Sequence, residues 1–244
     1  MEIDNESEDA CKGSPSSSKH YQSHVTFSSH PETTLYVHII TNLSNEDLPP
    51  ERIIENTKSF LHTNDNNEQY GERFAIMNAQ RVVSVKHLAI AANITLMKQR
   101  NKKQDEKKQE QQQQQVFKRG IALQTIINGA GSTHVGTVLR DYAFISTNDH
   151  KYTSSNTMYS IAVLGFNCSS KEMCDCISHI MNKDSDKING NGSSSCDEYF
   201  ISKKDRTQEQ LQDLCKSYKI TMDEINMSSL EDAIITRIST KYFT

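Results

Sequence analysis

Apolar residues in this sequence form short runs whose spacing separates strands from helices. Residues 35–41 (LYVHIIT) and 157–166 (TMYSIAVLGF) are rich in β-branched and aromatic side chains, a composition typical of strands. The second run is apolar almost throughout, which predicts a central strand covered on both faces. Residues 73–78 and 117–128 are further strand candidates, and residues 199–201 form either a short strand or the lead-in to a helix.

Helical spacing accounts for most of the remaining apolar residues, and several helices follow a capping residue. The capping residues are Ser84, Ser170, Ser229 and Thr207, the last with Gln210 in the capping-box position. The predicted helices cover about residues 47–61, 85–98, 133–142, 170–181, 207–218 and 229–241, with a short helical turn at 222–225. This order predicts an α/β fold: a single domain with a mixed sheet, helices packed on it and a helical C-terminal segment.

Three polar tracts interrupt this pattern. Residues 1–32 are rich in Ser, His and acidic residues, and we expect a disordered tail because they cannot bury enough apolar surface to offset their chain entropy. Residues 99–115 and 184–197 are low-complexity insertions. Apart from these insertions, residues 33–244 have the size of one ordinary domain, although only 35% of the chain is hydrophobic.

The helix predicted for residues 85–98 is apolar nearly all round. Its inner face consists of Val85, Leu88, Ala89, Ala92 and Leu96. Ile90, Ile94 and Met97, with Ala91 near them, lie on the other side. One face can pack on a sheet and something must cover the second, so this helix indicates a partner-binding surface.

The last helix places charges among its apolar residues. Its apolar face consists of Leu230, Ala233, Ile234 and Ile238. Arg237 and Lys241 fall within that stripe, whereas Ile235 points to the polar side. Two interpretations stay open: Arg237 extends its guanidinium to water or a carboxylate while its methylenes cover the core, or the helix is shared between the core and a partner.

Composition limits the function classes. The formal net charge of −4 argues against a broad nucleic-acid-binding surface, although it allows a local basic patch. The six cysteines lack the spacing of a disulfide framework, and the sequence shows neither an apolar signal-peptide segment nor a run long enough to span a membrane. These features predict a cytosolic or nuclear protein.

None of the candidate chemical motifs is complete, so the sequence predicts neither catalysis nor a metal or cofactor. The turn at residues 129–133 (GAGST) could bring backbone amides close to an anion, but it lacks the Lys of a phosphate-binding loop and the third Gly of a dinucleotide fingerprint. Cys174 and Cys176 would diverge on a helix, and His134 and His179 have no partner at a telling spacing.

Four segments are informative together: residues 74–96 (FAIMNAQRVVSVKHLAIAANITL), 132–146 (STHVGTVLRDYAFIS), 198–221 (EYFISKKDRTQEQLQDLCKSYKIT) and 230–241 (LEDAIITRISTK). In this order they resemble segments of the TPRKB family, the small non-catalytic subunit that binds the atypical kinase of the KEOPS (EKC) complex. With a weaker match at residues 35–61, the resemblance covers most of residues 35–241.

The resemblance implies a compact α/β subunit that is not an enzyme. Such a subunit binds a Bud-type (PRPK-like) atypical protein kinase and supports threonylcarbamoyladenosine modification of tRNA in the cytoplasm and nucleus. The partner-binding residues expected from the two helices are Ile90, Ala91, Ile94, Ile235, Arg237, Ile238 and Lys241. Archaeal relatives are associated with capturing the tRNA 3′ end, so the candidate nucleic-acid-binding residues are Lys118, Arg119, Lys203 and Arg237. No membrane or small-molecule substrate is expected.

Two other functions stay open. The chain could be a free-standing RNA-binding module if folding gathers its basic residues on one face. It could instead be a small-molecule enzyme that uses the turn at residues 129–133, where the sequence departs from the Leu-Ser-Pro-type loop usual in the family. A closed turn with a satisfied Ser cap would argue against the enzyme.

Overall fold

The computed structural model describes residues 18–46, 48–62, 72–106, 120–132, 134–143, 158–182, 194–202 and 206–243. Residues 1–17 of the expected tail, and residues 107–115 and 184–193 of the two expected insertions, lie outside these ranges. The described part of the first insertion, residues 99–106, continues a helix. That of the second, residues 194–197, forms a short strand and the start of a helix.

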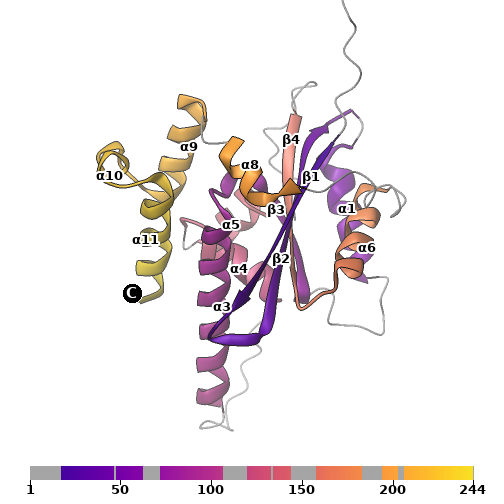
Figure 1. Ribbon diagram of the computed structural model, residues 1–244, viewed down its shortest axis with the longest axis horizontal. Coiled ribbons are helices and arrows are strands. Elements are labelled where there is room, and N and C mark those ends of the chain that lie inside the picture. The colour runs from indigo at the N-terminus through magenta and orange to yellow at the C-terminus, as the bar shows by residue number, and fades with distance from the viewer. Residues whose placement is uncertain are drawn as a thin grey trace, which may run out of the picture.

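One mixed sheet lies at the centre of the described structure (Figure 1). Its strands are β1 (Lys19–Phe27), β2 (His30–Ser44), β3 (Phe74–Asn78), β4 (Met158–Phe166) and β5 (Ser194–Ser195), in the order β3-β4-β2-β1-β5. The β1–β2, β2–β4 and β3–β4 pairs are antiparallel, whereas β1 and β5 are parallel. The predicted α/β class and the mixed sheet are therefore confirmed.

β4 is buried on both faces, as its apolar sequence predicts. All of its residues after Met158 are buried, and their side chains alternate between the two faces of the sheet. One face receives Tyr159, Ile161 and Val163, and the other receives Ala162, Leu164 and Phe166. The sheet therefore carries a hydrophobic core on each side.

The expected disordered tail is wrong for residues 19–32. β1 pairs with β2 over its whole length, with Tyr21 opposite Ile39 and Val25 opposite Leu35. Tyr21, Val25 and Phe27 pack on one core, and their even spacing places them on one face of the strand. The polar composition of the tract conceals this alternation, and the backbone hydrogen bonds to β2 stabilise the strand in a way that composition does not report.

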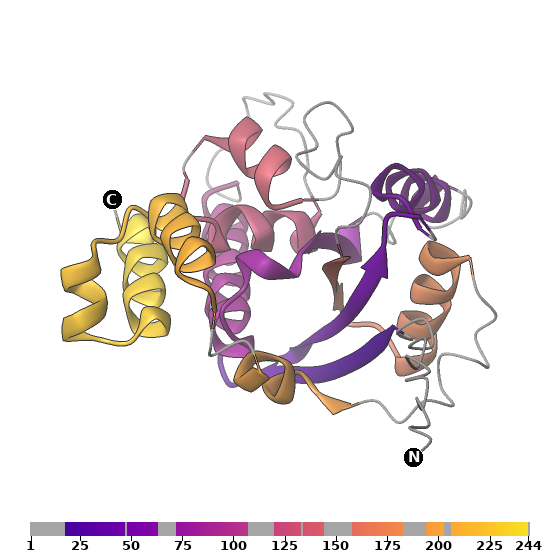
Figure 2. The same ribbon diagram turned by 90° about the horizontal axis from the view of Figure 1, so that it is seen from above.

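Helices cover both faces of the sheet, and further helices form an outer layer (Figure 2). On one face lie α1 (Pro50–His62) and α6 (Ser170–Met181), which pack against each other. On the other lie α3 (Val85–Glu106), α4 (Ile121–Gly129) and α8 (Cys196–Ser202). The remaining elements are η1 (Ala79–Arg81), α5 (Val135–Asp141), α9 (Gln208–Tyr218), α10 (Met222–Met227) and α11 (Leu230–Phe243).

Most of the predicted capping residues are confirmed. Ser84, Thr207 and Ser229 each accept a hydrogen bond from the backbone N–H three residues further on. For α6 the cap lies one residue earlier than expected, at Ser169 rather than Ser170, because the Ser169 side chain accepts a bond from the third residue of the helix.

Two stretches that the sequence favours as strands are helical. Residues 121–128 lie in α4, whose buried residues recur at helical spacing: Ala122, Thr125, Ile126 and Gly129. Residues 199–201 lie in α8, where Cys196 and Tyr199 are buried three residues apart. Both runs are too short for composition alone to separate a buried strand from a buried helix.

Candidate partner interface

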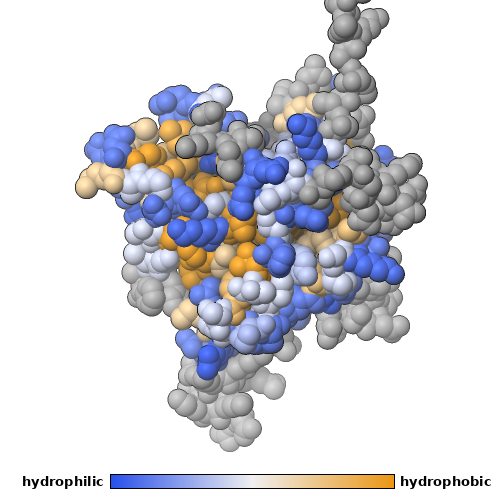
Figure 3. Space-filling model, in the orientation of Figure 1, coloured by the Kyte–Doolittle hydropathy of each residue, from blue (hydrophilic) through white to orange (hydrophobic). Residues whose placement is uncertain are grey.

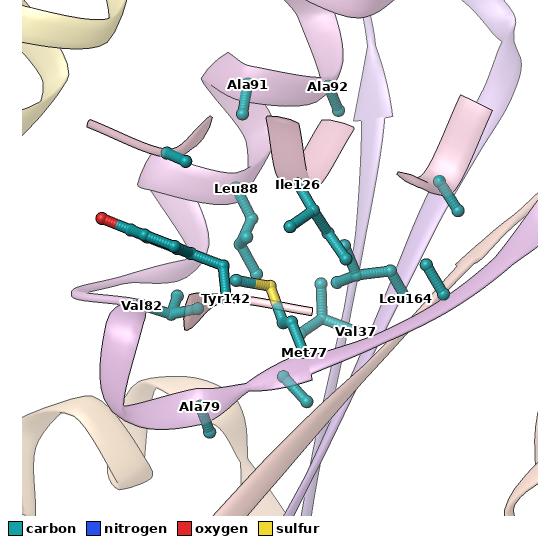
Figure 4. Close-up of a cluster of buried hydrophobic side chains, with 14 of the residues drawn as sticks. Val37, Met77, Ala79, Val82, Leu88, Ala91, Ala92, Ile126, Tyr142 and Leu164 are labelled. Atoms are coloured by element: carbon teal, nitrogen blue, oxygen red, sulfur yellow. The ribbon is translucent and has the colours of Figure 1, made fainter. Parts of the chain in front are cut away.

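Other parts of this chain cover Ala91 and Ile94, on the face of α3 that the sequence assigned to a partner. α3 packs beside α4 on the same face of the sheet, and Figure 4 shows Leu88, Ala91 and Ala92 directed into the cluster that contains Ile126 of α4. Ala91 is fully buried and Ile94 is 7% exposed. Gly129 allows this close approach, because a Cβ at that position would lie only 3.1 Å from the Cβ of Ala91.

Three of the predicted partner-binding residues are therefore wrong. Ala91 and Ile94 of α3 and Ile238 of α11 are buried inside the described structure, with Ile238 only 1% exposed. The error follows from the strand predicted at residues 117–128, because that interpretation left no helix of this chain to cover α3. With α4 in place, the apolar excess of α3 is mostly internal core.

α11 lies beside α3 and runs in the same direction (Figure 1). Near the start of both helices, Ser84 Oγ donates a hydrogen bond to Glu231 Oε1 at 2.5 Å, and Lys86 Nζ lies 3.8 Å from Asp232 Oδ1. Ile90 is one turn beyond Lys86, and Ile235 is one turn beyond Asp232. The two isoleucines therefore lie at the same level along the paired helices.

Side chains on the accessible surface of the paired helices α3 and α11 form a partly apolar stripe, which we call the α3–α11 seam. Its residues are Lys86, Ile90, Met97, Asp232 and Ile235. Ile90 and Ile235 are half-buried, and Met97 is 38% exposed. Figure 3 shows apolar residues gathered where α3 meets the C-terminal helices. Of the predicted partner-binding residues, Ile90 and Ile235 keep partly accessible side chains on this stripe.

Lys241 binds backbone carbonyls within the protein. Its Nζ donates to the carbonyl oxygens of Ile127 (3.3 Å), Ala130 (3.1 Å) and Ser132 (2.6 Å), at the C-terminal end of α4. The last carbonyls of a helix lack partners within the helix, and its C-terminal end favours a positive charge. Burial, with the charge of Lys98 nearby, lowers the pKa of Lys241 to about 8, so the ammonium form still predominates near neutral pH.

Arg237 reaches a carboxylate, as one of the two interpretations of the last helix predicts. Its Nη2 donates to Glu224 Oε1 at 2.9 Å and to the Lys219 carbonyl at 3.0 Å. Bonds from the backbone of Thr221 lower the pKa of Glu224, and the charge of Arg237 acts in the same direction. Arg237 therefore joins α10 and α11 within the subunit.

His87 of α3 and Tyr218 of α9 form a buried polar cluster around the C-terminal end of α4. His87 is 1% exposed, and burial lowers its pKa to about 4, so the ring is neutral and Nε2 donates to the Gly129 carbonyl at 2.9 Å. The Tyr218 hydroxyl lies 3.2 Å from the same carbonyl and 3.0 Å from the Arg81 carbonyl. Together with Lys241, these side chains satisfy the C-terminal carbonyls of α4.

The Gly-rich turn after α4 serves packing. A Cβ at Gly131 would lie 2.3 Å from the Ser217 carbonyl oxygen, so only glycine allows α9 to approach this closely. Ser132 Oγ accepts a bond from His134 N at 3.1 Å, and His134 is itself the N-cap of α5. Thr133 lies outside the described residues. The described turn is closed by these contacts, which supports the interpretation of residues 129–132 as a tight turn.

The described cysteines are free thiols in apolar surroundings. Cys176 is buried and Cys174 is only half-buried, which fits their different directions on α6. Burial raises the pKa of Cys168 to about 11 and raises that of Cys176 further. Among the described residues, no group of three or more His, Cys, Asp and Glu side chains could hold a metal ion. His179 packs against the Phe60 ring at a centroid distance of 5.5 Å.

Only one of the four candidate nucleic-acid-binding residues lies in the part of the chain that the structure describes. Lys118, Arg119 and Lys203 lie outside the described residues, and the fourth, Arg237, is held by Glu224. Within the described ranges, no helix is long and apolar enough to cross a membrane. No family model matches the sequence, and the search of curated proteins finds no match.

Two features of the described structure were not predicted from the sequence. One is the Lys86–Asp232 pair at the edge of the seam, whose members are far apart in the chain and become neighbours only when α11 docks on α3. The other is a small cavity between η1, α8 and α9 with Arg81 and Arg206 in its lining. No local pattern could have revealed either, because both depend on contacts between distant segments.

Proposed function

We propose that this chain is a non-catalytic subunit of the KEOPS (EKC) complex that binds and regulates its Bud-type (PRPK-like) atypical protein kinase. Support comes from the four segments that resemble the TPRKB family in order, which contribute residues to α3, α5, α9 and α11. Through the kinase, the subunit supports threonylcarbamoyladenosine modification of tRNA in the cytoplasm and nucleus. Direct contact of tRNA with Lys118, Arg119 and Lys203 stays a prediction.

The observation that carries this proposal is the α3–α11 seam. Ile90 and Ile235 lie at one level on adjacent helices, and burying one such aliphatic side chain against a partner contributes about 1.5–3 kcal/mol. The Lys86–Asp232 pair beside them is 60% exposed on both sides, so it contributes little to folding and is available to charged groups of a partner. We therefore centre the kinase-binding surface on Ile90 and Ile235.

The test is the affinity of the kinase for Ile90→Asp and Ile235→Asp variants of the full chain, measured by titration calorimetry. A charge in a buried apolar contact should weaken binding by tens-fold or more for each variant. Ile94→Asp is unsuitable, because Ile94 is buried in the subunit and its loss would confuse unfolding with loss of binding.

Met227→Asp is the matched control. Met227 is 90% exposed on α10, away from the seam, so this variant should bind the kinase like the wild type. Circular dichroism and thermal unfolding must show that all three variants are folded. Wild-type affinity in both seam variants would overturn the proposed surface, and failure of the wild-type chain to bind the kinase would overturn the proposed function.

A further inference from the structure

A small cavity of about 30 Å³ lies where η1, α8 and α9 meet. Its lining consists of Gln80, Arg81, Tyr199, Arg206, Gln210, Asp213 and Leu214. Tyr199 and Leu214 are buried and form its inner end, whereas Gln210 and Asp213 are exposed and form its rim. The cavity is therefore reached from solvent and ends on the core.

Among the described residues, no carboxylate balances the positive charge that Arg206 brings to this cavity. The Arg206 guanidinium is half-buried, and Nη2 donates to the Val82 carbonyl at 2.8 Å. Burial lowers the pKa of Arg206, and no carboxylate within the described ranges lies within 4.0 Å of it. A guanidinium removed from water is ordinarily paired with an anion.

The other charges around the cavity balance each other. Arg81 Nη1 lies 2.6 Å from Asp213 Oδ2 and donates to Ser217 Oγ at 2.8 Å. This pair is neutral overall, so the carboxylate on the rim is engaged and the charge of Arg206 remains in excess. Gln210 uses its Oε1 to accept from the Thr207 backbone at 3.3 Å, which leaves the donor end of its amide for other contacts.

The dimensions of the cavity restrict what it can hold. A water molecule needs about 10–15 Å³ of such volume, so about two waters or one small polyatomic group would fill it. A nucleoside or a sugar is too large. A guanidinium matches the oxygen spacing of a phosphoryl group, to which it donates two parallel hydrogen bonds.

We propose that the cavity between η1, α8 and α9 binds a single phosphoryl oxyanion, with Arg206 as the anchoring cation and Gln80 and Gln210 as neutral donors. This site is separate from the α3–α11 seam and does not depend on the kinase assignment. The phosphoryl group can belong to free inorganic phosphate or to a phosphorylated side chain, because both present the same oxygens to the cavity.

The test is binding of inorganic phosphate to the full chain, measured by titration calorimetry against sodium chloride of equal ionic strength. Wild type should bind phosphate saturably, and Arg206→Gln should lose about tenfold or more in affinity. Arg140→Gln is the matched control, because Arg140 is exposed on α5 and pairs with its own neighbour Asp141. This control should bind phosphate like the wild type.

A second measurement avoids any dependence on the folding of the Arg206 variant. In two-dimensional NMR of the wild-type chain, added phosphate should shift the Arg206 side-chain Nε–H signal and the side-chain amides of Gln80 and Gln210. Tighter binding of O-phosphoserine than of inorganic phosphate assigns the site to a phosphorylated side chain, and the reverse assigns it to the free ion. Absence of saturable phosphate binding, unchanged affinity in a folded Arg206→Gln variant, or shifts confined to other regions would overturn the proposal.

Discussion

The hydrophobic cores on the two faces of the sheet differ in how many buried polar side chains accompany them. Against α1 and α6 the core consists of aliphatic, aromatic and sulfur-containing side chains such as Ile53, Ile161 and Ile177, joined by the buried His38 of β2. On the α3 and α4 side, the apolar core is accompanied by fully buried polar residues. These are His87, Thr95, Thr125 and Asn128, and Asn128 Nδ2 donates to Thr95 Oγ1 at 2.8 Å.

The difference follows from what each face must bury. α1 and α6 lie on the sheet with their sides, and an apolar stripe is sufficient for that contact. On the opposite face the C-terminal end of α4 is itself enclosed, and its carbonyl groups must find donors. Polar residues are therefore concentrated where a helix terminus is buried, and the C-terminal helices are attached to the core through those residues.

The largest effect should come from the apolar face. Ile177→Ala on α6 truncates a fully buried side chain and leaves a cavity in an apolar cluster. It should therefore lower the free energy of unfolding by about 2–5 kcal/mol. Urea denaturation followed by circular dichroism measures this. Ile225→Ala, at a half-buried position of α10, is the control and should lose less. A loss below about 1 kcal/mol for Ile177→Ala would contradict this account of the face.

Acid should act on the polar face through His87. Its folded-state pKa of about 4 lies below the ordinary value of 6.5, so the unfolded chain binds more protons between these values. Stability should therefore be constant above about pH 6.5 and fall by up to about 3 kcal/mol as the pH drops to about 4. Thermal unfolding across this range measures the effect.

One histidine on the opposite face acts in the same direction. Burial and the neighbouring His20 lower the pKa of His38 to about 3. Separate His87→Gln and His38→Gln variants should each flatten the pH profile. If the dependence of stability on pH is unchanged in His87→Gln, the polar cluster around His87 is not the acid-sensitive part of the α3 and α4 side.

The smallest of the three effects concerns Lys241. Lys241→Met keeps most of the buried methylenes but removes the donor to three carbonyl groups, and we expect a loss of about 1 kcal/mol. Hydrogen exchange should accelerate in α11 and at the end of α4 more than in β4. Lys216→Met on the exposed side of α9 is the control. Equal exchange rates in the two variants would show that Lys241 does not attach α11 to α4.

Local signals made a large part of the fold predictable. β2, β3 and β4, the helix caps and the C-terminal helices were read from residues close together in sequence, where propensity and capping chemistry operate. α4 was not, because a short apolar run does not distinguish strand from helix. That single error produced the wrong placement of Ala91 and Ile94, since the helix that covers them was missing from the prediction.

The remaining features depend on distant contacts. β1 is recognisable only next to β2, and the seam only after α11 docks on α3. The cavity around Arg206 likewise joins residues more than 100 positions apart, such as Arg81 and Asp213. Sequence periodicity describes one element at a time, so it placed Ile90 and Ile235 on the outer sides of their helices without showing that they lie at the same level.

The position of β1 has a practical consequence for where the chain can be shortened. A version trimmed to the domain boundary near residue 33 that composition suggests would remove the strand between β2 and β5. The backbone of β2 would then present unpaired N–H and C=O groups along an open edge, which is a template for association between copies. Such a truncated protein would lose the core side chains of β1 as well as gain this open edge, so it should precipitate, and expression should begin ahead of Lys19.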